Sequence, residues 1–206
     1  APIAEDPVKQ DYGFQIHVGC DDACQGLFQE WLRRCAPTLA GLPRPQGLPN
    51  APRDLFVSPY PSEFHQTRFI AAQAAEFLRD GVGGTPWFTV CSFIAPHHPF
   101  EAPEDVIERY SSQDIPLPAL KGGVAMKDVP DRLASALGEF ARYPESVQRR
   151  IVQHYYASIT LIDDAVGRLL DELRRSGQYE NTVIVFVAQH LAMVGNEDDD
   201  SVLILP

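Results

Sequence analysis

The sequence is poor in lysine and has no long apolar run. Lysine occurs only at Lys9, Lys121 and Lys127, and the net charge is −11. An acidic chain of this kind is a poor electrostatic partner for nucleic acid or for an anionic membrane surface. No apolar run approaches the length of a membrane span. We therefore expect no nucleic-acid partner and no membrane partner.

The N-terminus lacks a recognisable targeting signal. Residues 1–7 do not show the basic and then apolar pattern of a signal peptide, so the compartment stays unknown. The first residue is Ala1 rather than Met, and we therefore expect a processed chain or a fragment.

Cysteine is scarce as well, because four cysteines in 206 residues are too few for a disulfide scaffold. Cys91 lies in an apolar run and is predicted to be a small core residue. His17, Cys20 and Cys24 could form part of a metal site, but no second pair of ligands follows at zinc spacing.

Hydrophobic residues make up 45% of the chain, which is enough for the core of one large domain or of part of a bigger one. Two stretches should interrupt its regular structure. Residues 36–61 hold seven prolines and are predicted to form a stiff connection without a regular helix or a central strand. Residues 101–145 contain repeated Pro and Gly breaks and are predicted to be an irregular insertion.

Apolar periodicity predicts three helices. The first covers residues 22–36, and the second covers residues 62–80 with Ser62 as its N-cap. The third and longest covers residues 146–176 and is ended by Gly177. Its predicted apolar stripe consists of Ile151, Val152, Tyr155, Ile159, Ile162, Val166, Leu169, Leu170 and Leu173.

Two apolar runs, residues 86–93 and residues 182–188, are predicted to be strands. Both are rich in β-branched and aromatic residues, and neither alternates cleanly between apolar and polar positions. Continuously apolar strands are typically buried on both faces, as in a parallel sheet. Because each run follows a predicted helix, the sequence indicates an α/β fold with a mostly parallel central sheet and flanking helices.

Both predicted strands lead into histidine. His97 and His98 lie between Pro96 and Pro99, which should hold them on a stiff turn, and His190 follows the second strand. The carboxyl ends of parallel strands meet at one edge, where ligands bind in open α/β sheets. We therefore expect these histidines to share a rim. The alternative is a rigid loop with a solvated histidine pair.

Three consecutive aspartates stand at residues 198–200. They could bind a hard cation, since carboxylate oxygens are the ligands that such ions prefer. A solvated acidic turn before a short strand also explains them, and we prefer that interpretation.

Several segments stand in a recognisable order: Phe64-His65-Gln66-Thr67, Trp87-Phe88, Pro96-His97-His98-Pro99-Phe100, Asp114-Ile115-Pro116-Leu117-Pro118, His154-Tyr155-Tyr156, Leu161-Ile162-Asp163-Asp164 and Asn181-Thr182-Val183-Ile184-Val185-Phe186. Together they resemble the sulfatases of the alkaline phosphatase superfamily. The resemblance runs from about Tyr12 to Gly195 and covers only the central to C-terminal part of the catalytic domain. It implies an alkaline-phosphatase-like α/β fold that is incomplete in these 206 residues.

The resemblance implies a hydrolase that acts on small-molecule sulfate monoesters. This family uses a formylglycine nucleophile, made from Cys or Ser in a C-x-P-x-R motif, and a divalent cation, usually calcium. The cation and positive side chains offset the charge that spreads over the sulfuryl oxygens. The family's P-H-x-P turn matches here at His97, which is thereby implied as a catalytic and substrate-binding residue. His98 is a further substrate-binding candidate.

The family's metal site is incomplete in this sequence. Where the family reads S-D-H-G or S-D-N-G after the last strand, this chain reads Ala188-Gln189-His190-Leu191. Gln189 and His190 are the metal-binding candidates. A neutral amide brings no charge and imidazole is a poor partner for calcium, so the metal affinity should fall. Asp163 and Asp164 do not stand in the context of the family's paired aspartates, and we expect them to serve structure.

The formylglycine motif is absent too. Cys35-Ala36-Pro37 resembles its beginning, but Leu39 stands where arginine is required. The stretch also follows a predicted helix instead of beginning one. We therefore expect the formylglycine outside this chain, and no activity of this chain alone.

Two alternatives to a sulfatase-like hydrolase stay open. One is a non-catalytic remnant or anion-binding module of the same fold. The other is a phosphate or phosphonate ester hydrolase of the same superfamily. In every case a slice of a sheet leaves an open apolar strand edge, so we also expect self-association through that edge.

Overall fold

The computed structural model describes residues 13–20, 24–43, 47–48, 51–52, 55–81, 84–97, 99–111, 114–117 and 140–188, and the backbone of residues 202–205. Its helices are α1 (Leu27–Cys35), α2 (Gln66–Glu76), α3 (Glu104–Ile107) and α5 (Glu145–Arg175). Shorter helical turns are η1 (Pro37–Leu39), η2 (Ser62–Phe64), η3 (Phe77–Gly81) and η5 (Tyr179–Asn181). The strands are β1 (Leu55–Val57), β2 (Phe100–Ala102), β3 (Ile184–Val187) and β4 (Val202–Leu205).

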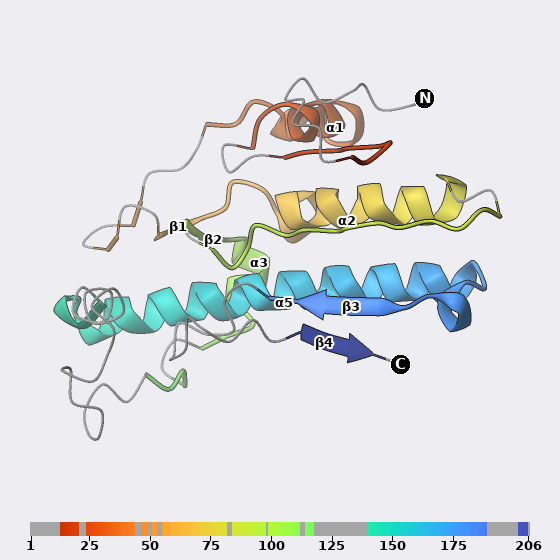
Figure 1. Cartoon of the computed structure of the whole chain (residues 1–206). Helices are drawn as coiled ribbons and strands as arrows, with labels where there is room; N and C mark the ends of the chain where they lie inside the picture. Colours follow the sequence, from red (N-terminus) through yellow and green to blue (C-terminus); the bar gives the residue numbers. More distant parts are fainter. Residues whose placement is uncertain are drawn as a thin grey trace.

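Two helix-to-strand units set the architecture. Helix α2 leads through η3 into an extended segment, residues 85–94, and α5 leads through η5 into β3. In Figure 1 the two helices run in one direction, and the two extended segments both return in the other. Helix α2 packs directly against α5. Helices that return the chain to its starting side produce parallel strands, and the predicted α/β class is confirmed.

Strand pairing is both parallel and antiparallel. Strands β1 and β2 pair in parallel with Leu55 opposite Phe100. Strands β3 and β4 pair antiparallel with Ile184 opposite Leu205, which confirms the short strand expected after the aspartates. The aspartates themselves, residues 198–200, lie outside the described residues.

The two predicted interior strands are not buried on both faces, and that prediction was wrong. Residues 85–94 are extended without ladder pairing to another described segment, and exposed side chains alternate with half-buried ones. Phe88 and Val90 are exposed, whereas Trp87 and Cys91 are half-buried. Strand β3 likewise exposes apolar side chains. Composition reveals that a strand is apolar, but it does not reveal whether a second layer covers the strand within the same chain.

Helix α1 confirms the first predicted helix and forms the centre of an aromatic cluster. Leu27, Phe28 and Leu32 are buried on one side of it, where Tyr60 and Phe69 join them. The ring of Phe28 meets those of Tyr60 and Phe69 edge-on, with centroid distances of 5.2 and 5.7 Å. Edge-on aromatic pairs stabilise a core beyond the area that they bury.

Helix α5 confirms the longest predicted helix almost residue for residue. It has 31 residues, yet neither it nor any other described helix is apolar enough to cross a membrane. Gly177 follows it at φ 71°, a left-handed conformation that glycine adopts without steric cost.

The buried stripe of α5 differs from the predicted one. Ile159 is exposed, whereas the buried residues are Ile151, His154, Ala157, Ser158, Leu161, Ala165 and Leu173. Small side chains at Ala157 and Ser158 let β2 lie close to the helix. A count of large apolar residues does not detect such a contact.

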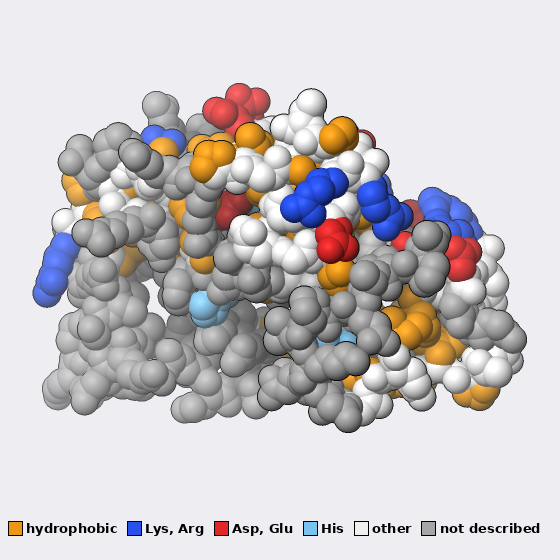
Figure 2. All heavy atoms as spheres, turned by 90° about the horizontal axis from the view of Figure 1, so that it is seen from above, with side chains coloured by type: hydrophobic (Ala, Val, Ile, Leu, Met, Phe, Trp, Pro, Cys, Tyr) orange, Lys and Arg blue, Asp and Glu red, His pale blue; other side chains and the backbone are white. Residues whose placement is uncertain are grey.

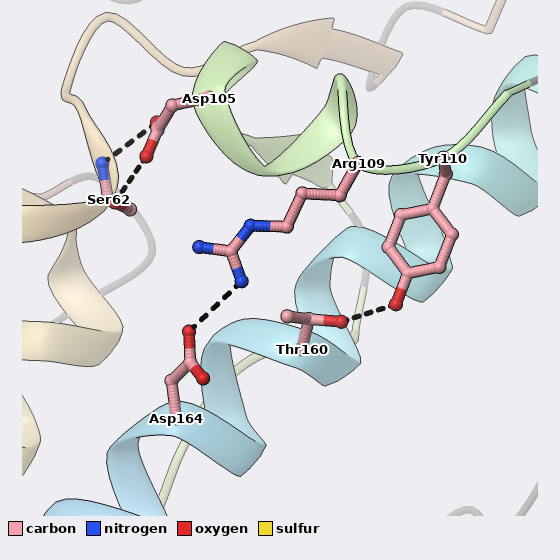
Figure 3. Close-up of polar contacts among 6 residues, drawn as sticks. All are labelled: Ser62, Asp105, Arg109, Tyr110, Thr160 and Asp164. Carbon is pink, nitrogen blue, oxygen red and sulfur yellow. Dashed lines mark hydrogen bonds and ion pairs between the residues drawn. The ribbon is translucent and has the colours of Figure 1, made fainter.

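Helix α3 joins η2 to α5, as Figure 3 shows. The backbone amide of Ser62 donates to the carboxylate of Asp105 at 3.1 Å, and the Ser62 hydroxyl donates to the same carboxylate. Just beyond α3, Arg109 pairs with Asp164 of α5 at 3.4 Å. Ser62 is therefore held by a residue far along the chain and is not the helix N-cap that the sequence predicted.

The N-cap of α2 is His65. Its Nδ1 accepts a hydrogen bond from the amide of Thr67 at 3.2 Å, which satisfies one of the donors that a helix start leaves open.

Replacing Asp105 with alanine should lower the free energy of unfolding by about 1 kcal/mol, because two charge-assisted hydrogen bonds to Ser62 are lost. Arg109→Ala, which changes a residue just beyond α3, is the matched control. Its ion pair with Asp164 is half exposed and should contribute under about 0.5 kcal/mol. Urea unfolding of both variants measures the difference. Equal losses would contradict this assignment.

Short regular elements lie inside the two stretches in which Pro and Gly interrupt the chain. Strand β1 lies inside the proline-rich residues 36–61, and α3 together with part of β2 lies inside residues 101–145. The reason is tertiary, since β1 pairs with β2 and α3 packs against α5.

Candidate active site

His97 lies on a turn at the end of the extended segment 85–94. Its backbone amide donates to the carbonyl of Ile94 at 3.1 Å, and the Ala95–Pro96 peptide is cis. Its side chain is exposed. The structure thus places His97 where the sequence indicated, on a proline-held turn after an extended run.

The chain that follows this turn is fastened to α5. His154 Nδ1 donates to the carbonyl of Phe100 at 3.0 Å. The Ser158 hydroxyl donates to the carbonyl of His154 at 2.9 Å and lies within 3.3 Å of the carbonyl of Glu101. From the side of β1, the Ser58 hydroxyl donates to the Glu101 carboxylate at 2.6 Å. Strand β2 cannot slide along α5 without breaking these bonds, so the His97 turn leads into a rigid element.

Hydrogen bonds also hold the chain that precedes the turn. They lie near the start of segment 85–94 and near the chain that leads into β3. Trp87 Nε1 donates to Gln178 Oε1 at 2.9 Å, and Gln178 Nε2 donates to the carbonyl of Leu78 at 3.2 Å. The Trp87 ring also meets that of Phe77 edge-on at 6.0 Å. Gln178, which follows α5, therefore ties the two helix-to-strand units together.

The other predicted site residues cannot be placed. His98, Gln189 and His190 lie outside the described residues, so the shared histidine rim stays a prediction. The common direction of segment 85–94 and β3 in Figure 1 is the one that such a rim requires.

The described residues do not form a calcium site. No group of three or more His, Cys, Asp or Glu side chains among them could hold a metal ion. Calcium binds several oxygen ligands with charge among them, and an exposed imidazole such as His97 does not meet that need. His17, Cys20 and Cys24 belong to the described part and form no metal site either.

Cys35 is unsuited to be a nucleophile, as the sequence indicated. It lies at the C-terminal end of α1, and its thiol donates to the carbonyl of Trp31 at 3.1 Å. The Cys35 thiol is exposed at the surface, yet partial desolvation still raises its pKa, whereas an activated thiol needs a lowered pKa. Burial also raises the pKa of Cys91, to about 11, in agreement with an inert packing role.

Two buried histidines, His65 and His154, received no role from the sequence analysis. His154 has no exposed surface, and no described group pairs with its Nε2. Burial lowers the pKa of each imidazole to about 4, so both are neutral at pH 7. The sequence did hold a signal that His154 is buried. His154 stands three residues from both Ile151 and Ala157, so the three side chains share one helix face.

At His97 the arrangement offers an accessible imidazole on rigid support. An imidazole N–H can donate a hydrogen bond to an anionic oxygen. Such a group binds or orients an anion, but the described residues around it supply no activated nucleophile.

The chain is similar to several hydrolases. An arylsulfatase from Clostridium perfringens is 29% identical over 139 residues, which cover 68% of this chain and 29% of that protein. The multifunctional alkaline phosphatase superfamily protein PehA from Trinickia caryophylli is 29% identical over 150 residues, which cover 66% of this chain and 29% of that protein. The chain therefore spans less than a third of the length of these curated relatives.

One solved structure matches nearly the whole chain. It is the phosphonate monoester hydrolase of Agrobacterium radiobacter, with a TM-score of 0.66 and 22% sequence identity. The match covers 97% of this chain and 44% of that chain. The chain accordingly has the fold of the matched part of that structure.

The family itself follows from a match over most of the sequence. The profile of the Sulfatase family matches residues 20–201, which includes both helix-to-strand units and the His97 turn. The resemblance that the sequence motifs showed is thereby confirmed, and the chain belongs to the sulfatase family.

Proposed function

We propose that this chain is the central to C-terminal part of a catalytic domain that hydrolyses sulfate monoesters. The observation that carries the proposal is the Sulfatase match over residues 20–201, with the exposed His97 turn inside it. The chain has no complete C-x-P-x-R motif and spans less than a third of its curated relatives. In this proposal, turnover needs the formylglycine that residues outside this chain supply.

His97 has the role of a substrate-binding and catalytic group. Its imidazole donates a hydrogen bond to an oxygen of the sulfate ester as charge builds up there. The anchoring of β2 to His154 and Ser158 supports this role, because a group on a rigid element keeps its direction during the reaction. His98, the next residue, is a second substrate-binding candidate.

Gln189 and His190 are the residues of this chain that we propose to face a divalent cation, which is calcium in most of the family. Because the described residues do not fit a calcium site, no step of the proposal depends on a metal held by them. The part of this chain is to bind and orient the ester.

A phosphonate or phosphate ester is the second candidate substrate. The similarity to a phosphonate monoester hydrolase structure and to PehA favours it. Sulfate, phosphonate and phosphate esters all present tetrahedral groups with anionic oxygens, so a hydrogen-bond donor at His97 serves each of them.

Parallel assays separate these functions. Aryl sulfate, aryl phosphate and a phenyl phosphonate monoester are offered to this chain alone and to the enzyme completed with its nucleophile-bearing part. We expect no turnover by the chain alone and preferential turnover of aryl sulfate by the matured, metal-replete enzyme. A matured enzyme that leaves the aryl sulfate intact would overturn the proposal, and preference for the phosphonate would establish the second candidate.

Replacing His97 with alanine should weaken the binding of inorganic sulfate about tenfold, because one charge-assisted hydrogen bond is lost. Isothermal titration calorimetry of the 206-residue chain measures the affinity. His17→Ala is the matched control, since His17 is also exposed but lies far from the turn in sequence. Equal affinities of the two variants would contradict the assigned role.

A further inference from the structure

Apolar side chains face solvent along three segments, namely residues 13–18, residues 85–94 and residues 183–187. The exposed fraction reaches 75% for Phe88 and 81% for Val183. The exposed apolar residues of these segments are Phe14, Ile16, Phe88, Val90, Val183, Val185, Phe186 and Val187. We call the set formed by Phe14, Ile16, Phe88, Val90, Val183, Val185 and Val187 the open face.

In residues 85–94 and 183–187 the members of the open face recur at every second position, whereas residues 13–17 are all exposed. Successive side chains of an extended chain point to opposite sides, so residues two apart share one side. Between Phe88 and Val90, Thr89 is half-buried, and Trp87 on the same side contacts Phe77 at the end of α2. One side of segment 85–94 is therefore packed against the molecule while the other meets solvent.

A ring contact joins two segments of the open face. The rings of Phe14 and Phe88 stack at a centroid distance of 5.8 Å with 14° between their planes. On the packed side, the Trp87–Gln178 hydrogen bond joins segment 85–94 to the chain between α5 and η5, which leads into β3. In Figure 2 hydrophobic side chains reach the surface in more than one place, and one group of them lies at the lower right of the view.

The open face is incompatible with an α/β layer that stands alone in water. Mostly parallel layers are covered on both faces, because their strands are apolar on both sides. Here α2 and α5 belong to the packed side, and no described helix buries the exposed residues. An exposed apolar patch of this kind marks an interaction surface.

We propose that the open face docks the remaining part of a sulfatase-type domain, through apolar side chains of that part. The solved relative that matches 97% of this chain has only 44% of its own length matched, so most of it has no counterpart here. The three segments that carry the open face contain no Asp, Glu, Lys or Arg, which favours an apolar occupant over an acidic or basic one. The inference rests on the proposed function, since the occupant is the part that bears the nucleophile.

Co-expression tests this docking. The tagged 206-residue chain is produced together with the portion of the Clostridium perfringens arylsulfatase that has no counterpart here. We expect a one-to-one complex after purification and a fall in the fluorescence of the apolar dye ANS relative to the chain alone. The variant Phe88→Asp with Val185→Asp should weaken the complex about tenfold or more.

Leu42→Asp is the matched control, because Leu42 is an exposed apolar residue outside the three segments. It should leave the complex intact, and circular dichroism checks that both variants keep their helices. A milder variant, Val90→Ser, repeats the test if the double variant does not fold.

Absence of a complex, or a complex whose affinity the open-face substitutions leave unchanged, would overturn the inference. A homodimer disrupted by Phe88→Asp would overturn it too, because a second copy would then be the occupant. Binding is measured without turnover, so a failure here is distinct from a failure of the sulfatase proposal.

Discussion

Lowering the pH from 7 to 5 should reduce the free energy of unfolding by about 4 kcal/mol, through His65 and His154 together. The pKa of each falls from 6.5 to about 4 on folding, and burial is the main cause. Between these values the unfolded chain binds more protons than the folded one. Stability is therefore fully present above pH 6.5 and declines as the pH falls toward 4, by about 2 kcal/mol per histidine at pH 5.

The surroundings of the two histidines differ in charge. Asp105 lies near His65 and raises its pKa, which offsets part of the burial effect. Near His154 the charged neighbour is Arg150, which further disfavours protonation, while the hydrogen bond to Phe100 raises the pKa. We therefore expect His154 to remain neutral until the fold itself opens.

Urea unfolding at pH 7 and at pH 5 measures this loss. The variant His154→Gln removes one titrating imidazole, so its loss between the two pH values should be about 2 kcal/mol smaller than that of the unmodified chain. An identical loss in both proteins would show that His154 does not carry the acid sensitivity.

Replacing Phe28 with alanine should cost about 3–5 kcal/mol of the free energy of unfolding, which is the usual cost of truncating a buried aromatic side chain. Phe28 has no exposed surface, and its ring contacts those of Trp31, Tyr60 and Phe69. Truncation leaves a cavity at the centre of the α1 cluster. Because the aromatic cluster joins α1 to α2, the thermal unfolding followed by the helical circular dichroism signal should have a lower midpoint temperature.

Ile159→Ala is the control for Phe28→Ala. Ile159 is an apolar residue in the middle of α5, but it is exposed, so its truncation should change the free energy of unfolding by under about 0.5 kcal/mol. Thermal and urea unfolding compare the two variants. A small effect of Phe28→Ala would show that the aromatic cluster does not hold α1 in place.

Local patterns were enough to predict the helices and their order. The apolar period located α5 within one residue at each end, and Gly177 ended it by the expected left-handed turn. The position of the His97 turn also followed from Pro96 and Pro99, which restrict the backbone locally. Such features depend on neighbours in sequence, and so one sequence suffices to find them.

Features that depend on distant residues were missed. Ser62 has the chemistry of an N-cap, but Asp105, 43 residues away, binds it instead. The buried stripe of α5 passes through His154, Ala157 and Ser158 because β2 lies there, and no periodicity of large apolar residues reveals that strand. Exposure of the open face could not be foreseen either, since Val and Phe look alike in sequence whether or not a second layer covers them.

The shared rim of His97 and His190 is most directly tested by a distance. Spin labels are attached to His97→Cys and His190→Cys in a chain whose four native cysteines are replaced by alanine, and double electron–electron resonance measures their separation. Two parallel units that end at one edge predict a separation far below the length of α5, which is ~46 Å for its 31 residues. A separation close to that length would place the histidines at opposite ends of the molecule and would contradict a common anion site.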